Sequence, residues 1–439
     1  MINFIKRNIN KDLIFTGLNQ LWRLVSGPLM LILVPFYLTA EEQGFWYTFS
    51  SLAALAILAD LGFSTIVLQF AAHEFAHLEF NEEKISGDTL HLQKLAKLFT
   101  FCVKWATGLS LIAFPIILFV GFIILTEKST NVQWIFPWII YGVSSAVVFI
   151  NSTILYFFEG CNSVGRIQNI RLKIAICTFI VMTLLLVLKC NLYALSFSLL
   201  ANAIFGIYQI RKEFWLTIKY LFHIAIDCTY SWKREFLSLI KRYAISWVSG
   251  YLTFQIYTPL AFHNYGPIKA GKIGISMALW LAVFTLSSIW INAITPKLNM
   301  YVSKKDWDSL DKIFFSNLLF SLATYIIGVF MVLVSMSILE NRELVYNRFL
   351  DIRSMAILAA CLFLQLIVNT LATYLRAHKE EPLVIPFFVA AIYIVTVTFL
   401  CSQYLSIEYL FIGYLSSYLF LLPWIISIFY KQRKIWHYD

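Results

Sequence analysis

Twelve long apolar runs occupy most of this sequence and constrain what the chain can fold into more than any other feature. A helix needs about 20 apolar residues to cross the hydrocarbon core of a bilayer. The runs are too long and too uniformly apolar for the alternating pattern of a barrel strand. The sequence therefore predicts an all-α integral membrane protein with about twelve transmembrane helices. The predicted spans are Leu13–Leu38, Phe45–Leu68, Phe101–Leu125, Trp134–Phe157, Leu172–Leu188, Leu192–Ile210, Tyr243–Phe262, Ile273–Ile294, Ile313–Ile338, Met355–Leu375, Leu383–Cys401 and Tyr409–Tyr430.

Composition excludes a soluble protein. Charged residues make up 13% of the chain and hydrophobic residues 60%, whereas a soluble domain carries about 25% charged residues. The formal net charge of +10 does not indicate nucleic-acid binding, because basic residues hold the loops of membrane proteins on the cytoplasmic side. The seven cysteines occur singly and form no CxxC pair, so we expect packing residues rather than a disulfide framework or a metal site.

The distribution of Lys and Arg predicts the orientation. If the N-terminus is cytoplasmic, 26 of the 34 basic residues lie in the cytoplasmic connections and tails or, for Lys104 and Lys173, in the first turn of a span that begins there, and seven belong to the opposite side. Arg23, inside the first span, is the remaining one. This asymmetry predicts that both termini are cytoplasmic.

The connection 211–242 lies at the midpoint of the chain, with six spans on either side. We expect an N-terminal lobe over 1–210, a basic and aromatic connecting segment over 211–242 that lies along the membrane as an amphipathic helix, and a C-terminal lobe over 243–439. The short outer turns Thr39–Gly44 and Gly266–Gly271 both end in Gly before a span. Their matching positions indicate an internal duplication of six spans.

Several short motifs carry a resemblance to a known family. They are the turn Glu41–Trp46, the stretch Asp60–Phe63 late in span two, the segment Phe158–Arg166 after span four, the turn Gly266–Gly271, and the exit Thr295–Lys297 of span eight. In this order they resemble the polysaccharide flippases of the multidrug/oligosaccharidyl-lipid/polysaccharide exporter (MOP) superfamily. O-antigen (Wzx-type) flippases are the nearest comparison, and the drug-exporting MATE branch is more distant.

The resemblance implies two six-helix lobes around a central cavity that opens alternately to the two sides of a bacterial cytoplasmic (inner) membrane. The implied cargo is a polyprenyl-diphosphate-linked oligosaccharide of the undecaprenyl type. The expected partners are this cargo, membrane lipids, and a polysaccharide polymerase or chain-length machinery. We expect no nucleic acid, no cofactor and no metal.

Arg23 is the sharpest candidate for a binding residue. A charge near the middle of a span costs about 2.5 kcal/mol or more, so it should face a cavity. Asn19 and Gln20 precede it by about one turn. The planar guanidinium matches phosphate oxygens, so we expect these residues to bind the diphosphate. Asp60, the acid well inside a span, could couple transport to protons, pair with Arg23, or cap a helix.

Intramembrane amides form a second candidate set. Gln365 and Asn369 are one helical turn apart and form one polar stripe on span ten. Spans seven, eight and ten line the cavity in the resembled family. We therefore expect Gln255, Asn292, Gln365 and Asn369 to contact sugar hydroxyls, although such amides can also join helix to helix.

A basic rim is expected at the cytoplasmic entrance. Its members are Glu159, Arg166, Arg171 and Arg376. They could be topology anchors only, but together they could recruit an anionic headgroup from the inner leaflet.

One motif points to a different class of protein. His73–His77 reads H-E-x-x-H, which on a helix places two imidazoles on one face as in zinc proteases. A third ligand is not evident, and a protease would not explain twelve spans in two similar halves. No phosphate-binding loop and no large outer loop occur, so ATP hydrolysis and glycosyl transfer are not expected. The sequence favours a flippase that is not an enzyme, with a cation-coupled drug or metabolite exporter as the alternative and the membrane protease as a remote third.

Overall fold

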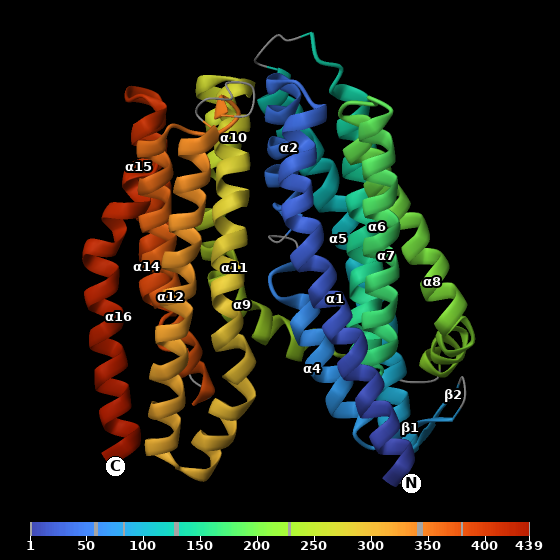
Figure 1. The fold of residues 1–439 in the computed structure, drawn as a ribbon. Coiled ribbons are helices and arrows are strands. Elements are labelled where there is room, and N and C mark those ends of the chain that lie inside the picture. The colour runs from blue at the N-terminus through green and yellow to red at the C-terminus, as the bar shows by residue number, and fades with distance from the viewer. Residues whose placement is uncertain are drawn as a thin grey trace. The chain divides into compact units, whose positions relative to one another are not determined.

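The computed structural model describes residues 2–56, 60–81, 84–126, 131–226, 230–339, 346–378 and 381–438. The chain forms two compact helical units, shown in Figure 1. Unit 1 comprises Met1–Leu38 and Phe49–Val248, and unit 2 comprises Thr39–Thr48 and Ser249–Asp439. The division therefore passes through helix α2 (Ala40–Ala53) and near the end of helix α9 (Lys233–Phe254).

Unit 1 is a helical bundle with one small hairpin. Besides the second part of α2 and most of α9, its elements are α1 (Ile2–Tyr37), α4 (Phe63–Phe75), β1 (Leu78–Asn81), β2 (Lys84–Gly87), α5 (Thr89–Thr126), α6 (Ile135–Gly160), α7 (Val164–Val187) and α8 (Tyr193–Ile226). Helix α1 packs on α7, and α6 packs on α4, α5 and α8. Strands β1 and β2 pair antiparallel, with Leu78 opposite Gly87.

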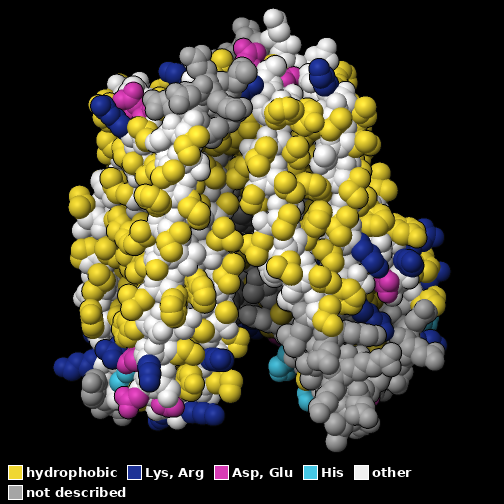
Figure 2. All heavy atoms as spheres, viewed as in Figure 1, with side chains coloured by type: hydrophobic (Ala, Val, Ile, Leu, Met, Phe, Trp, Pro, Cys, Tyr) yellow, Lys and Arg dark blue, Asp and Glu magenta, His cyan; other side chains and the backbone are white. Residues whose placement is uncertain are grey.

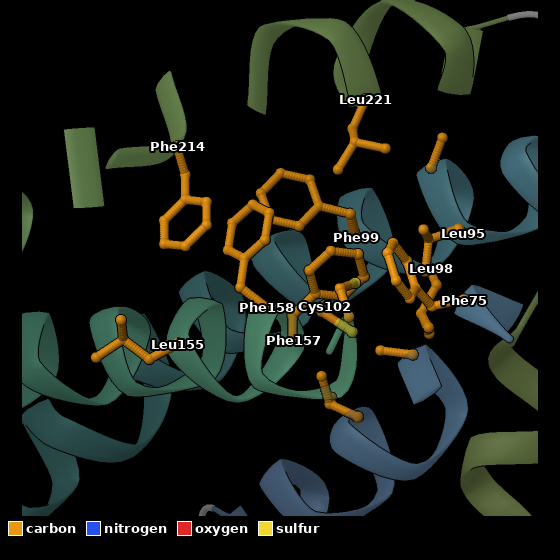
Figure 3. Packing of buried hydrophobic residues seen from close by; sticks show 14 of the residues in the cluster. Phe75, Leu95, Leu98, Phe99, Cys102, Leu155, Phe157, Phe158, Phe214 and Leu221 are labelled. Atoms are coloured by element: carbon orange, nitrogen blue, oxygen red, sulfur yellow. The ribbon is translucent and has the colours of Figure 1, made fainter. Parts of the chain in front are cut away.

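The core of unit 1 is aromatic at one end of the bundle. Phe99 of α5 lies beside Phe157 and Phe158 of α6, and Phe214 of α8 stacks on Phe158 with ring centroids 4.0 Å apart. Figure 3 shows these rings pointing toward one another, with Leu221 of α8 above them. All of these side chains are nearly inaccessible to solvent, so they fix how α8 is rotated against α5 and α6.

Unit 2 holds the remaining helices. They are α10 (Tyr257–Tyr265), α11 (Pro267–Lys304), α12 (Trp307–Leu339), α14 (Ile352–Ala377), α15 (Val384–Tyr404), the 3-10 helix η1 (Ile407–Tyr409) and α16 (Ile412–Tyr438). Helix α11 packs on α10, α12 and α14, and α16 packs on α14 and α15. Asp351 caps α14 by accepting hydrogen bonds from the backbone N–H groups of Arg353 and Ser354.

The first part of α2 lies on α11 within unit 2. The backbones approach so closely that a Cβ on Gly44 would overlap the carbonyl oxygen of Pro267, and a Cβ on Gly271 would lie 2.9 Å from the amide nitrogen of Gly44. Gln43 donates from Nε2 to the carbonyl oxygens of Gly271 at 3.0 Å and Arg348 at 3.2 Å. The two outer turns that the sequence paired as a repeat are thus in direct contact.

The structure confirms the all-helical membrane protein. Among the described residues, ten helices are long and apolar enough to cross a membrane. The other two predicted spans are broken helices: span two is divided between α2 and α4, and span seven between α9 and α10. The breaks have local causes, since Leu61 and Gly62 adopt positive φ before α4, and the chain turns at Gln255 before α10.

Hydrophobic side chains cover the sides of both units, and charged side chains gather at helix ends (Figure 2). Exposed Leu, Ile and Phe residues on α5, α12 and α15 belong to this surface. A soluble protein would not expose so much contiguous apolar area, whereas lipid chains would cover it.

Candidate functional site

The diphosphate site predicted on α1 contains one buried and two exposed side chains. Asn19 is buried and donates from Nδ2 to Oε1 of Gln168 on α7 at 2.8 Å. Gln20 and Arg23 are exposed on unit 1. In the described part of the chain, no salt bridge of Arg23 is found. The guanidinium therefore retains its donors for a ligand, although it lies in an apolar helix.

A polar network joins α1, α6 and α7. Gln168, which accepts from Asn19, donates from Nε2 to Oε1 of Glu159 at 3.1 Å. The other carboxylate oxygen of Glu159 lies 2.8 Å from Nη2 of Arg171, whose guanidinium sits 4.7 Å from the ring centre of Tyr156. The network thus connects residues that the sequence assigned to two separate sites, the diphosphate site and the entrance rim.

Gln168 is the member of this network that sequence reasoning missed. It lies between Glu159 and Arg171 in the chain and three residues before Arg171 on the same helix face. That spacing was the available signal. Its partner on α1 is 149 residues away, so only the packing of α1 on α7 reveals the link.

The two other rim residues do not join this network. Arg166 is exposed near the start of α7. Arg376 belongs to unit 2, where its Nε donates to Oε1 of Glu381 at 2.7 Å on the surface. Both residues are exposed at helix ends on the side predicted to be cytoplasmic, which matches the topology-anchor alternative.

Asp60 caps a helix. Its Oδ1 accepts from the backbone N–H of Ser64 at 3.1 Å and from the Ser64 hydroxyl at 2.6 Å, at the start of α4. The ion pairs found among the described residues include none between Asp60 and Arg23. Of the three alternatives for Asp60, the geometry matches the cap.

The polar stripe predicted on span ten lies inside unit 2. The Oε1 atom of Gln365 accepts from the hydroxyl of Tyr418 at 2.6 Å and from that of Tyr414 at 3.4 Å, and its Nε2 donates to Oδ1 of Asn369 at 2.8 Å. Both tyrosines belong to α16, and Gln365 is 8% exposed. Gln365 therefore joins α14 to α16, and Asn369 is the more accessible of the two amides.

The other two predicted amides lie at different kinds of position. Gln255 occupies the turn between α9 and α10, where the helix is broken and backbone groups leave the regular hydrogen-bond pattern. Asn292 is exposed on α11. In transporters, broken helices commonly contribute to binding sites, which keeps Gln255 among the candidates.

The H-E-x-x-H segment does not have the geometry of a zinc motif. Helix α4 ends at Phe75, so His77 lies beyond it and stacks on His91 with ring centroids 4.0 Å apart. Glu74 is buried and its Oε2 lies 2.8 Å from Nδ1 of His91. The His73 side chain is 76% exposed. No group of three or more potential metal ligands is found among the described residues.

A second polar cluster, absent from the sequence predictions, lies at one end of unit 2. Asp311 on α12 accepts from the hydroxyl of Tyr374 at 2.8 Å and forms an ion pair with Arg433 on α16. The Tyr374 hydroxyl also lies 3.1 Å from Nε2 of His437. Neighbouring His378 is half-buried and stacks on Trp436, and burial lowers its pKa. The cluster fastens the end of α16 to α12 and α14.

Comparisons with known proteins give a match in structure and none in sequence. No family model and no curated protein matches the chain. An inward-facing multidrug resistance MATE family transporter of the MOP superfamily matches with a TM-score of 0.63 at 13% identity, over 95% of this chain and 96% of the transporter. The chain has the fold of MOP-superfamily transporters.

Two further solved structures show the breadth of this fold. The lipid II flippase MurJ matches with a TM-score of 0.61 at 13% identity, over 96% of this chain and 89% of the flippase. A MOP superfamily transporter from Pyrococcus furiosus matches with a TM-score of 0.52 at 13% identity, over 97% and 95% of the two chains. The MATE-like fold expected from the motifs is thereby confirmed.

Proposed function

We propose that the chain is a flippase, a transporter rather than an enzyme, for a polyprenyl-diphosphate-linked oligosaccharide used in surface polysaccharide biosynthesis. It would move this lipid from the cytoplasmic to the periplasmic leaflet of a bacterial inner membrane by alternating access. The observation that carries the proposal is Arg23, an exposed cation in an apolar helix, one turn from a partly buried polar network.

The chemistry of Arg23 suits a diphosphate. A guanidinium binds two phosphate oxygens in one plane, and an apolar span leaves it few competing partners. Exposed Gln20 beside it adds an amide donor, while the network from Asn19 to Arg171 fixes α1 against α7. The site would therefore present a positioned cation rather than a mobile one.

The cargo also explains how transport could run without ATP. A diphosphate that moves outward across the membrane potential releases roughly 2.3 kcal/mol per charge for every 100 mV. The matched MurJ is itself named a lipid II flippase, so the fold accommodates transport of this general kind. Asn369, Gln255 and Asn292 would contact the sugar, with Gln365 contributing through Asn369.

The test is a leaflet-translocation assay in proteoliposomes with an undecaprenyl-diphosphate-linked glycan. We expect the wild-type protein to accelerate transfer and Arg23→Ala to reduce it at least tenfold, whereas Arg23→Lys should keep part of the rate. Arg353→Ala is the matched control, because Arg353 is exposed in the first turn of α14, before the predicted span ten begins at Met355. No acceleration by wild type would refute the function, and full activity of Arg23→Ala would refute the site.

A cation-coupled drug or metabolite exporter is the second candidate. The match to a multidrug resistance transporter favours it as strongly as the match to the flippase favours the first. Accumulation of a fluorescent lipophilic cation in proteoliposomes under a proton or sodium gradient separates the two. Gradient-driven accumulation of the dye, with no glycolipid transfer, would replace our proposal with the exporter.

A further inference from the structure

Helix α8 is too long to be only a transmembrane span. Its 34 residues correspond to about 51 Å of helix, against a hydrocarbon core of about 30 Å. The predicted span six ends at Ile210, and the helix continues without a break to Ile226. The segment that follows the span is therefore a rigid extension, which differs from the separate helix expected to lie along the membrane.

The core fixes which side of this extension faces outward. Phe214, Thr217, Leu221 and Ala225 are buried, and they recur at spacings of three and four residues. Figure 3 shows Phe214 and Leu221 directed at the phenylalanines of α5 and α6. The opposite side of the helix is consequently held away from the protein interior.

That outer side carries two cations around one indole. Arg211, Trp215 and Lys219 are successive at intervals of four residues, and all three are exposed. The Arg211 guanidinium and the Lys219 ammonium each lie 4.9 Å from the ring centre of Trp215. Such contacts hold long side chains that would otherwise be disordered by rotamer entropy. The helix therefore presents a prearranged cationic pair.

Further basic and apolar groups lie along the same extension. Lys84 of β2 lies 6.0 Å from the ring of Tyr220, and Lys97 of α5 donates to the carbonyl oxygen of Ala225. Figure 2 shows Lys and Arg side chains gathered over α8. The exposed apolar residues along the same extension are Leu216, Phe222 and Ile226.

We propose that this face of α8 binds an anionic phospholipid, with the phosphate at the edge of the Trp215 ring, within reach of Arg211 and Lys219, and the acyl chains beside exposed Ile204 and Tyr208 in the adjoining span. The basic residue count assigns this end of α8 to the cytoplasmic side, where anionic lipids are concentrated. Half-buried Glu213 offsets part of the charge, but Lys212 follows Arg211 directly and restores it.

A phospholipid fits the exposed residues of this face better than a nucleic acid does. Nucleic acid would not require exposed Leu216, Phe222 and Ile226 on the same extension as the cations. Trp and basic residues together with apolar ones are typical of a membrane interface, where a ring sits at headgroup level. Because the extension continues directly from a membrane span, its first turns, with Arg211 and Trp215, are held at that surface. The proposal is independent of which cargo the protein carries.

The experiment measures lipid retention by the full-length protein. Wild type in neutral detergent is titrated with phosphatidylglycerol or phosphatidylcholine and analysed by native mass spectrometry. We expect preferential retention of phosphatidylglycerol. The double variant Arg211→Gln/Lys219→Gln should bind it roughly 30-fold more weakly, since each basic residue near an anionic surface is worth about 1 kcal/mol.

The matched control is Lys304→Gln/Lys305→Gln, which removes two exposed charges at the end of α11 in unit 2. It should bind like wild type, and so should Arg211→Lys/Lys219→Arg. Equal losses in the α8 variant and the α11 control would overturn the proposal. If the double variant fails to fold, wild type decides: its preference for phosphatidylglycerol must fall between 50 and 500 mM salt, and an unchanged preference also overturns the proposal.

Discussion

Whether a buried amide of this protein can bind a ligand depends on the hydrogen bonds that it already makes within the protein. Gln365 lies on a polar stripe that fits a sugar site, yet its carbonyl oxygen already accepts from Tyr414 and Tyr418. Asn19 likewise uses its amide within unit 1, on Gln168. At the residue scale, the donors that remain available are those of the exposed side chains, above all Arg23.

We predict that Gln365→Leu destabilises the protein by about 1–3 kcal/mol, because two buried tyrosine hydroxyls lose their acceptor. The midpoint of thermal unfolding in detergent measures the loss. Tyr418→Phe should cost less, since it removes one donor and leaves Gln365 bonded to Tyr414 and Asn369. A Gln365→Leu protein that is as stable as wild type but fails in transport would instead place Gln365 in the cargo site.

At the scale of elements, close backbone packing and capping determine where helices begin, end and dock. The first part of α2 belongs to unit 2 because Gly44 lets its backbone reach Pro267 and Gly271. The turn before α5 depends on a carboxylate instead: Asp88 accepts from the backbone N–H groups of Leu90 and His91 at 2.8 and 3.2 Å.

Gly44→Ala should destabilise the protein by about 2 kcal/mol or more. The new Cβ would overlap backbone atoms of Pro267, which cannot rotate away as a flexible side chain can. Gly108→Ala in the middle of α5 is the control, because a Cβ there meets open space and should stabilise the helix by about 0.5–1 kcal/mol. Similar unfolding midpoints for the two variants would contradict the close contact.

The Asp88 cap should respond to pH. Hydrogen bonds from the backbone N–H groups of His91 and Leu90 lower the pKa of Asp88 below its unfolded value. The carboxylate therefore stabilises the first turn of α5 above the unfolded pKa of about 3.9, and this contribution is lost as the pH falls through the folded pKa.

Hydrogen exchange of the first turn of α5 tests this cap. At pH 7, Asp88→Ala should exchange several-fold faster than wild type, and the difference should shrink as the carboxylate protonates. Asp88→Asn keeps a capping oxygen and should lie between them. Equal exchange in wild type and Asp88→Ala at pH 7 would show that the cap contributes nothing.

At the scale of the whole molecule, the fold persists where sequence similarity does not. Residue identity to the matched transporters is 13%, yet the match to the MATE transporter extends over 95% of this chain. Span length and apolar character are sufficient to maintain helices in a bilayer, so many side chains can change without altering the architecture.

Both termini should be cytoplasmic, because 26 of the 34 basic residues lie on the side of the tails. A green fluorescent protein fused to the C-terminus should fluoresce, and alkaline phosphatase at the same position should be inactive. Fusion of the phosphatase to the loop after Lys189, on the opposite side, should be active. The reverse pattern would invert the orientation of every span.

The sequence by itself determined the class of protein, ten of the twelve predicted spans as long apolar helices among the described residues, and the polar residues within them. These properties depend on local hydropathy, because every helix must match the same hydrocarbon thickness regardless of its neighbours. The short motifs of the outer turns and of the segment after span four also led to the correct superfamily fold. Arg23 could also be identified from the sequence, because it is a charged residue within an apolar run.

Only the tertiary structure decided which polar groups remain free. Gln168 joins Asn19 to Glu159 across three helices, and Gln365 is occupied by tyrosines from α16. His77 does not share a helix with His73, because α4 ends two residues before His77, at Phe75. These contacts depend on residues far away in the chain or on the residue at which a helix ends. Neither can be predicted from the hydropathy of the sequence. The chemistry of a side chain follows from its residue type, whereas its availability to a ligand depends on how the helices pack.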